Sequence, residues 1–230
     1  GKSFASTLAG IAINDGYLKN ENQTLDQFYD LKSFANYDPK KDNVKIKDLL
    51  TMSAAFEGSD QNSDSAGNEE NMYPTDDWVK FTLDLPMDKS KTNGGQWDYF
   101  TAGVVLLGDI IHKSVPGGLE KYADEKLFKP LNITHYQWQY TPQKVANTAG
   151  SLQMTALDYA KYAQLYQNNG LWNGKQRIPS CFQWLSLYCH ISTEIHISSL
   201  ISPCSPNFII GYQISPNNPS LDGRCAILNH

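Results

Sequence analysis

The stretch GKSFASTLAGIAINDGYL, residues 1–18, decides the fold of this chain. Phe4, Leu8 and Ile11 recur at spacings of four and three, and an alanine follows each of them. This spacing puts the apolar side chains on one face of a helix, and Gly16 supplies the stop signal at its end. The stretch therefore predicts a helix whose apolar face is buried in a core.

Lys2, at the start of this helix, is compatible with two kinds of chemistry. Gly-Lys-Ser closes the phosphate-binding loop of P-loop proteins. In serine acyl-transfer enzymes with an S-x-x-K motif, the lysine follows a nucleophilic serine by one helical turn. For the P-loop, VVLLGD at 104–109 could be a strand that delivers a magnesium-binding aspartate. Asp109 continues a helical face better than it ends a strand, so we expect an NTPase fragment to be the weaker alternative.

The composition excludes several classes of protein. The 230 residues carry a formal net charge of −5, and the longest basic cluster is Lys40-Lys41, which argues against a nucleic-acid partner. No apolar run approaches the roughly 20 residues that span a bilayer, so no transmembrane segment is expected. The four cysteines lie between 181 and 225 and form no C-x-x-C pair, so no metal site is predicted.

The rest of the chain predicts mainly helices, with short strands. We expect a helix entered at Asp48, a helix or strand over 104–111, and an amphipathic helix from 119 that Pro130 ends. Another helix follows in 151–170 and ends at Asn169-Gly170. The acidic segment 57–77, rich in Asn, Ser and Gly, is interpreted as a solvated surface loop.

Several segments together resemble the serine beta-lactamase and penicillin-binding-protein superfamily, in particular its class C-like, esterase-like branch. They are, in the family's order, residues 1–18, VKIKDLLTMSAAFE (44–57), WDYFTAGVVLLGDII (97–111), EKLFKPLNITHYQW (125–138) and SLQMTALDYAKYAQLYQNNGLWNGKQRIP (151–179). The resemblance covers about residues 1–180. It implies an α/β (α+β) fold with a helical lobe and an antiparallel sheet that is incomplete in this chain.

The resemblance implies catalytic roles for two residues. Lys2 matches the lysine of S-x-x-K, so the serine would stand two places before Gly1, and a solvated terminal lysine is the plain alternative. Tyr99 matches the tyrosine of Y-x-N, and a buried aromatic is the plain alternative. A free phenol ionises only near pH 10, so such a base needs a positive charge beside it, which Lys2 would supply. We therefore predict that Lys2 and Tyr99 meet in one cleft.

Two further residues are predicted to bind substrate. Thr101 stands where the motif usually has asparagine, which favours a relative with another substrate over a dedicated beta-lactamase. Trp97 is placed at the mouth of the pocket, with a core position as its alternative. The family's third motif, K-T-G or H-x-G, is not found, and KTN at 91–93 comes too early and is interpreted as a loop.

The resemblance stops near Pro179. We interpret residues 1–180 as a partial hydrolase region and residues 181–230 as a divergent or non-native tail. Charged residues become rare in this tail, all four cysteines occur in it, and the third motif is missing from it. This chain alone is therefore expected to be inactive. The intact protein would hydrolyse an ester, amide or beta-lactam of a small-molecule or peptide substrate through an acyl-enzyme, without cofactors. A non-catalytic binding or regulatory relative is the alternative. Family members are often exported, which implies a periplasmic or secreted location.

Overall fold

The computed structural model describes residues 1–150 and 152–179, so the predicted tail lies outside the described residues. The longer helices are α1 (Lys2–Asn14), α5 (Trp78–Asp84), α6 (Thr101–Ser114), α7 (Gly118–Ala123) and α8 (Ala156–Gln167). The shorter ones are α2 (Pro39–Asp42), α3 (Ile46–Leu50) and α4 (Glu69–Met72), with 3-10 turns at Leu25–Gln27, Leu31–Ser33 and Lys129–Leu131 and a π-helical turn at Asp124–Phe128. The fold is helix-rich, as predicted.

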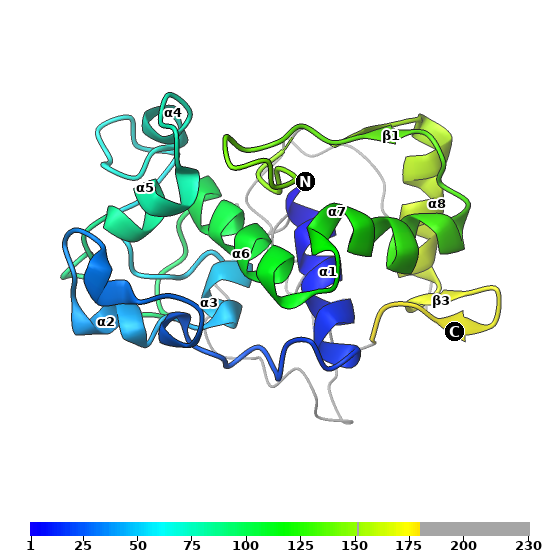
Figure 1. The fold of residues 1–230 in the computed structure, drawn as a ribbon, viewed down its shortest axis with the longest axis horizontal. Helices are drawn as coiled ribbons and strands as arrows, with labels where there is room; N and C mark the ends of the chain where they lie inside the picture. Colours follow the sequence, from blue (N-terminus) through cyan, green and yellow to red (C-terminus); the bar gives the residue numbers. More distant parts are fainter. Residues whose placement is uncertain (151, 180–230) are drawn as a thin grey trace, which may run out of the picture.

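Helix α1 lies in the middle of the molecule, between α6 and α8 (Figure 1). Its residues from Phe4 to Ala12 are all buried. Helix α6 packs against α1, α3, α5 and α7, and it is buried from Thr101 to Ile111. A helix that is apolar all round belongs in the core, and this is why its sequence alone did not distinguish a helix from a buried strand.

Aromatic stacking and a cluster of hydroxyl groups join α1 to α8. The rings of Phe4 and Tyr162 stack with their centroids 4.1 Å apart. The Thr7 hydroxyl lies 2.7 Å from the Tyr162 hydroxyl and also hydrogen-bonds the hydroxyl of Tyr166. At the start of α8 the Thr155 side chain accepts a hydrogen bond from the amide of Asp158, which caps the helix. The end of α1 that begins at Lys2 is thereby fixed against α8.

The strands form two small antiparallel pairs. Strand β1 (Tyr136–Gln137) pairs with β2 (Gln153–Met154), and β3 (Leu171–Trp172) pairs with β4 (Lys175–Gln176). Asn173 and Gly174 between β3 and β4 both have positive φ, 50° and 72°, as a type I′ hairpin turn requires. The Asn-Gly pair is a strong hairpin signal that the sequence interpretation missed. A helical lobe with an incomplete antiparallel sheet agrees with the predicted α/β (α+β) class.

Three predictions about local structure need correction. Helix α3 begins at Ile46, two residues before the predicted entry at Asp48, because the Asp48 carboxylate accepts a hydrogen bond from the amide of Lys45 ahead of the helix. The predicted helix from 119 is α-helical only to Ala123. A π-helical turn follows it, and Pro130, which has no N–H to continue an α-helix, lies in the 3-10 turn after that.

The third correction concerns residues 57–77, which are more ordered than a solvated loop. Ser65, Asn68 and Met72 are buried, and α4 lies inside the segment. The Asn68 side chain donates to the carbonyl oxygens of Ser59, Asp60 and Asn62, which closes the segment on itself. Acidic composition therefore does not mean solvation here, because a buried amide supplies the internal hydrogen bonds.

Candidate active site

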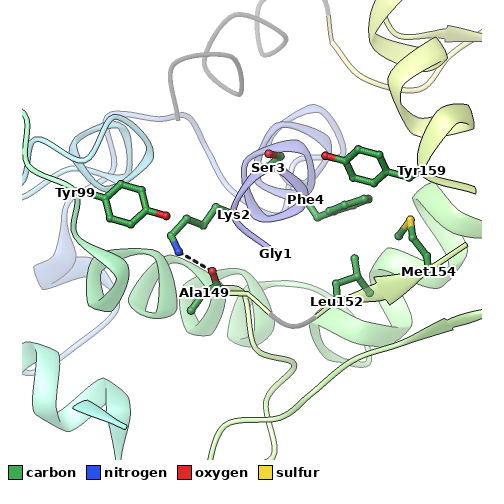
Figure 2. A pocket seen from close by; sticks show the side chains of 9 residues that line it. All are labelled: Gly1, Lys2, Ser3, Phe4, Tyr99, Ala149, Leu152, Met154 and Tyr159. Atoms are coloured by element: carbon green, nitrogen blue, oxygen red, sulfur yellow. Dashed lines mark hydrogen bonds between the residues drawn. The ribbon is translucent and has the colours of Figure 1, made fainter. Parts of the chain in front are cut away.

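Lys2 is the first residue of α1 and lies on the wall of a cavity of about 210 Å³. Its ammonium group donates a hydrogen bond to the carbonyl oxygen of Ala149, 2.7 Å away (Figure 2). The same nitrogen lies 5.0 Å from the centroid of the Tyr99 ring. The structure therefore brings together the two residues that were predicted to share a cleft, although they are far apart in the sequence.

Hydrogen bonds to α6 and within the segment itself fix the chain around Ala149. Thr148 donates its hydroxyl to the carbonyl oxygen of Val104 in α6, at 2.8 Å, and the Asn147 side chain accepts from the amide of Ala149. Gly108 lets the two chains approach, since a Cβ there would lie 2.3 Å from the Thr148 hydroxyl oxygen. The carbonyl that Lys2 binds is therefore held by α6 and not by a free loop.

Tyr99 precedes α6 and is positioned by the residues on either side of it. The amide of Asp98 donates to the carbonyl oxygen of Met52, and Phe100 is buried against Phe56 with ring centroids 6.0 Å apart. The Tyr99 ring is half-buried and lines the same cavity as Lys2. Phe100 thus acts as an anchor that fixes the Tyr99 backbone beside the cavity.

The remaining lining of the cavity combines polar and apolar surface. It consists of Gly1, Ser3, Phe4, Ala149, Leu152, Met154 and Tyr159. Figure 2 shows Lys2 and Tyr99 toward one end of the cavity and Met154 and Tyr159 toward the other. The sequence interpretation did not identify the lining residues beyond position 148. They carry no motif, and the only signal for Leu152, Met154 and Tyr159 was that segment 151–179 resembles the family.

The structure does not bring Trp97 and Thr101 to the cavity wall. The Trp97 ring lies 6.4 Å from the Tyr99 ring and packs against the core, while Thr101 is fully buried as the first residue of α6. In the part of the chain that the structure describes, neither belongs to the cavity lining. Their predicted contact with substrate therefore stays a prediction.

The structure corrects one further expectation about a site, the interpretation of Asp109. Asp109 lies in the middle of α6, where it accepts a hydrogen bond from Tyr29 and pairs with Lys113 at 2.6 Å, so its interpretation as a strand-borne magnesium ligand is wrong. Within residues 1–150 and 152–179, no group of three His, Cys, Asp or Glu side chains could hold a metal ion. Over the same two ranges, no helix has the length and apolarity to span a bilayer.

We expect Gly58→Ala to destabilise the protein by about 1–3 kcal/mol, as overpacking of a core does. A Cβ at Gly58 would lie 2.2 Å from the Phe100 ring, so the anchor beside Tyr99 would have to move. Thermal unfolding followed by circular dichroism measures the effect. Gly150→Ala is the matched control, because a Cβ there meets nothing within 4 Å, and equal melting temperatures for the two variants would contradict the prediction.

Comparisons with known proteins agree with the resemblance seen in the sequence. Among solved structures, the chain is similar to a protein assigned as a 6-aminohexanoate-dimer hydrolase from Bacillus anthracis, with a TM-score of 0.64 and 18% identity over 80% of this chain and 50% of that one. A penicillin-binding protein from Bacillus halodurans matches with a TM-score of 0.61 and 15% identity over 80% and 61%. A class C beta-lactamase mutant matches with 0.53 and 17% over 81% and 52%.

This chain therefore spans between half and about three fifths of the length of these structures. At such low identity the likeness concerns the fold. A search of curated proteins found no match. The family model described as Beta-lactamase matches residues 1–187, which is most of the chain and includes α1, the cavity and α8. On this match the chain belongs to the beta-lactamase family.

Proposed function

We propose that the intact protein is a serine hydrolase that works through an acyl-enzyme. The observation that carries the proposal is the placement of the Lys2 ammonium group 5.0 Å from the centroid of the Tyr99 ring, on a shared cavity. Serine is a poor nucleophile unless a base takes its proton. A serine one turn ahead of Lys2 on the same helix would face the same cavity, since residues three apart lie on one side of a helix.

In the proposed reaction the serine oxygen forms a bond to the substrate carbonyl carbon, and its proton passes to the Lys2–Tyr99 pair. The bond from that carbon to the leaving oxygen or nitrogen then breaks, and the pair returns the proton to the leaving group. Water repeats the sequence, releases the acid and restores the serine. The pair accepts the serine proton only with one of its two groups deprotonated, as the Tyr99 phenolate beside the Lys2 ammonium or as the Lys2 amine beside the phenol. These transfers need no metal or organic cofactor.

The substrate in this proposal is an ester, amide or beta-lactam of a small molecule or peptide. The apolar end of the cavity, with Phe4, Leu152 and Met154, favours an apolar substituent on the acyl group because burying it there removes it from water. We also propose that the protein works outside the cytoplasm, in the periplasm or as a secreted protein, as exported relatives do.

Thr101 favours a second candidate function, a binding or regulatory protein that keeps the fold without the chemistry. A threonine in place of the usual asparagine removes an amide from the motif, and here that threonine is fully buried. The residue two places before Gly1 distinguishes the candidates, because only the hydrolase needs a serine there.

The proposal is tested with the protein that includes the residues before Gly1. We expect it to release p-nitrophenol from short-chain p-nitrophenyl esters and to incorporate one acyl group, seen as a mass increase of the intact protein. Replacement of the upstream serine by alanine should abolish both signals. If the unaltered protein is folded but shows neither turnover nor acylation with ester, amide and beta-lactam probes, the binding-protein candidate is correct.

A further inference from the structure

Asp60, near the start of the segment 57–77, contacts the chain on both sides of Phe100. Its amide donates a hydrogen bond to the carbonyl oxygen of Tyr99, at 2.7 Å. Its carboxylate accepts a hydrogen bond from the amide of Thr101, also at 2.7 Å. One residue therefore holds both ends of the short segment that joins Tyr99 to α6.

The carboxylate supplies a cap that α6 cannot provide for itself. The N-cap residue of α6 is Phe100, whose side chain has no oxygen to accept a hydrogen bond, and the first turn begins Thr101-Ala102-Gly103 without an acidic residue. The first amides of a helix need acceptors, and a negative charge near them is favourable. Asp60 meets both needs from a segment about forty residues earlier in the chain.

Asp60 is in turn held in place by its own segment. The second oxygen of its carboxylate accepts a hydrogen bond from the amide of Glu69 at the start of α4, at 2.9 Å, and the buried Asn68 side chain donates to its carbonyl oxygen. Burial raises the pKa of the Asp60 carboxyl group, and the hydrogen bonds from Thr101 and Glu69 oppose that rise. A partly buried carboxylate with both oxygens hydrogen-bonded is a rigid support.

We propose that Asp60 is a positioning residue for the catalytic tyrosine. By holding the backbone of Tyr99 and the first amide of α6, it sets the place of the Tyr99 phenol relative to Lys2. The proposal rests on the proposed function, since it gives Tyr99 a role in proton transfer. It also gives the acidic segment 57–77, which was interpreted from the sequence as a surface loop, a role in supporting Tyr99.

The test compares Asp60→Ala and Asp60→Asn with the control Asp64→Ala in the protein that carries the upstream serine. Asp64 lies in the same segment with an exposed side chain. We expect Asp60→Ala to lower kcat about 10-fold or more with KM within about 2-fold, because a small misplacement of a catalytic group acts on the chemical step. Asp60→Asn keeps one acceptor oxygen, so its kcat should lie between those of Asp60→Ala and the unaltered protein. Asp64→Ala should have the same kcat as the unaltered protein.

A second measurement separates positioning from folding. The measurement is the NMR chemical shift of the Tyr99 phenol, in protein labelled with tyrosine that carries 13C at Cζ. The Tyr99 signal is identified as the one that is missing from the spectrum of Tyr99→Phe. Its chemical shift should change in both Asp60 variants and stay the same in Asp64→Ala. If Asp60→Ala does not fold, kcat and the Tyr99 signal are both measured on Asp60→Asn. A folded Asp60 variant with an unchanged Tyr99 signal and unchanged kcat per folded molecule would overturn the proposal. If the unaltered protein hydrolyses nothing, the proposed function fails, and the Tyr99 signal alone then supports or overturns the positioning.

Discussion

Replacing Tyr99 by phenylalanine is expected to lower kcat of the intact protein about 100- to 1000-fold, within the range of general acid–base catalysis. The change removes only the phenolic hydroxyl. The ring that lies 5.0 Å from the Lys2 nitrogen stays, and so does the anchor at Phe100, so the arrangement of the cavity should persist. Ester hydrolysis under single-turnover and steady-state conditions measures the loss, which should fall on acylation.

Tyr37→Phe is the matched control for this experiment. Tyr37 is exposed at 37%, and its hydroxyl bonds the Asp42 carboxylate on the surface, so its loss should leave kcat unchanged. Full turnover by Tyr99→Phe would show that the phenol takes no part in proton transfer, and Lys2 alone would then have to serve as the base.

Replacing Lys2 by methionine is expected to have an even larger effect, a loss of about 1000-fold or more in kcat. Methionine keeps an unbranched side chain of similar length but removes the charge and the hydrogen-bond donor. The carbonyl oxygen of Ala149 then loses its 2.7 Å partner, and the Tyr99 ring loses the cation beside it. Lys2→Met therefore affects both the proton transfer and the position of Ala149 in the cavity wall.

Lys2→Arg separates these two contributions. Arginine keeps a positive charge and can donate to Ala149, but it does not give up its proton near neutral pH. We expect Lys2→Arg to remain nearly as inactive as Lys2→Met while it recovers thermal stability. Lys32→Met, at an exposed position, is the control for loss of a lysine. High activity in Lys2→Arg would mean that Lys2 acts only through its charge.

The helices of the fold could be predicted where the large apolar residues recur at helical spacing. The spacing of Phe4, Leu8 and Ile11 gave α1 nearly to its ends, and Asn169-Gly170 lies just beyond the end of α8. Helix α6 stayed ambiguous because it is buried on every side and lacks a periodic pattern. The change from α-helix to π-helical turn after Ala123 is a change in backbone hydrogen bonding, which hydrophobic spacing does not register.

The candidate site could be predicted only in part, for a different reason. Lys2 and Tyr99 were named because they match motifs, and the structure places them together. Ala149 contributes a backbone carbonyl, and any residue type carries one, so its identity says nothing of its role. Asp60 acts on Thr101 across a distance in sequence that local patterns do not cover. Sequence gives the chemical groups of the site, whereas the supports that orient them depend on tertiary contacts.

The closure of α1 on α8 has a consequence for how the protein is made. Lys2 bonds a residue 147 positions later, and Thr7 bonds one 155 positions later. At a synthesis rate of roughly 5–20 residues per second, Lys2 and Thr7 therefore wait on the order of 10–30 seconds before these two partners exist. Helix α6 is made earlier and can already pack against α1, but the side of α1 that α8 covers has no partner during that time, so the cavity is among the last parts of the protein to form.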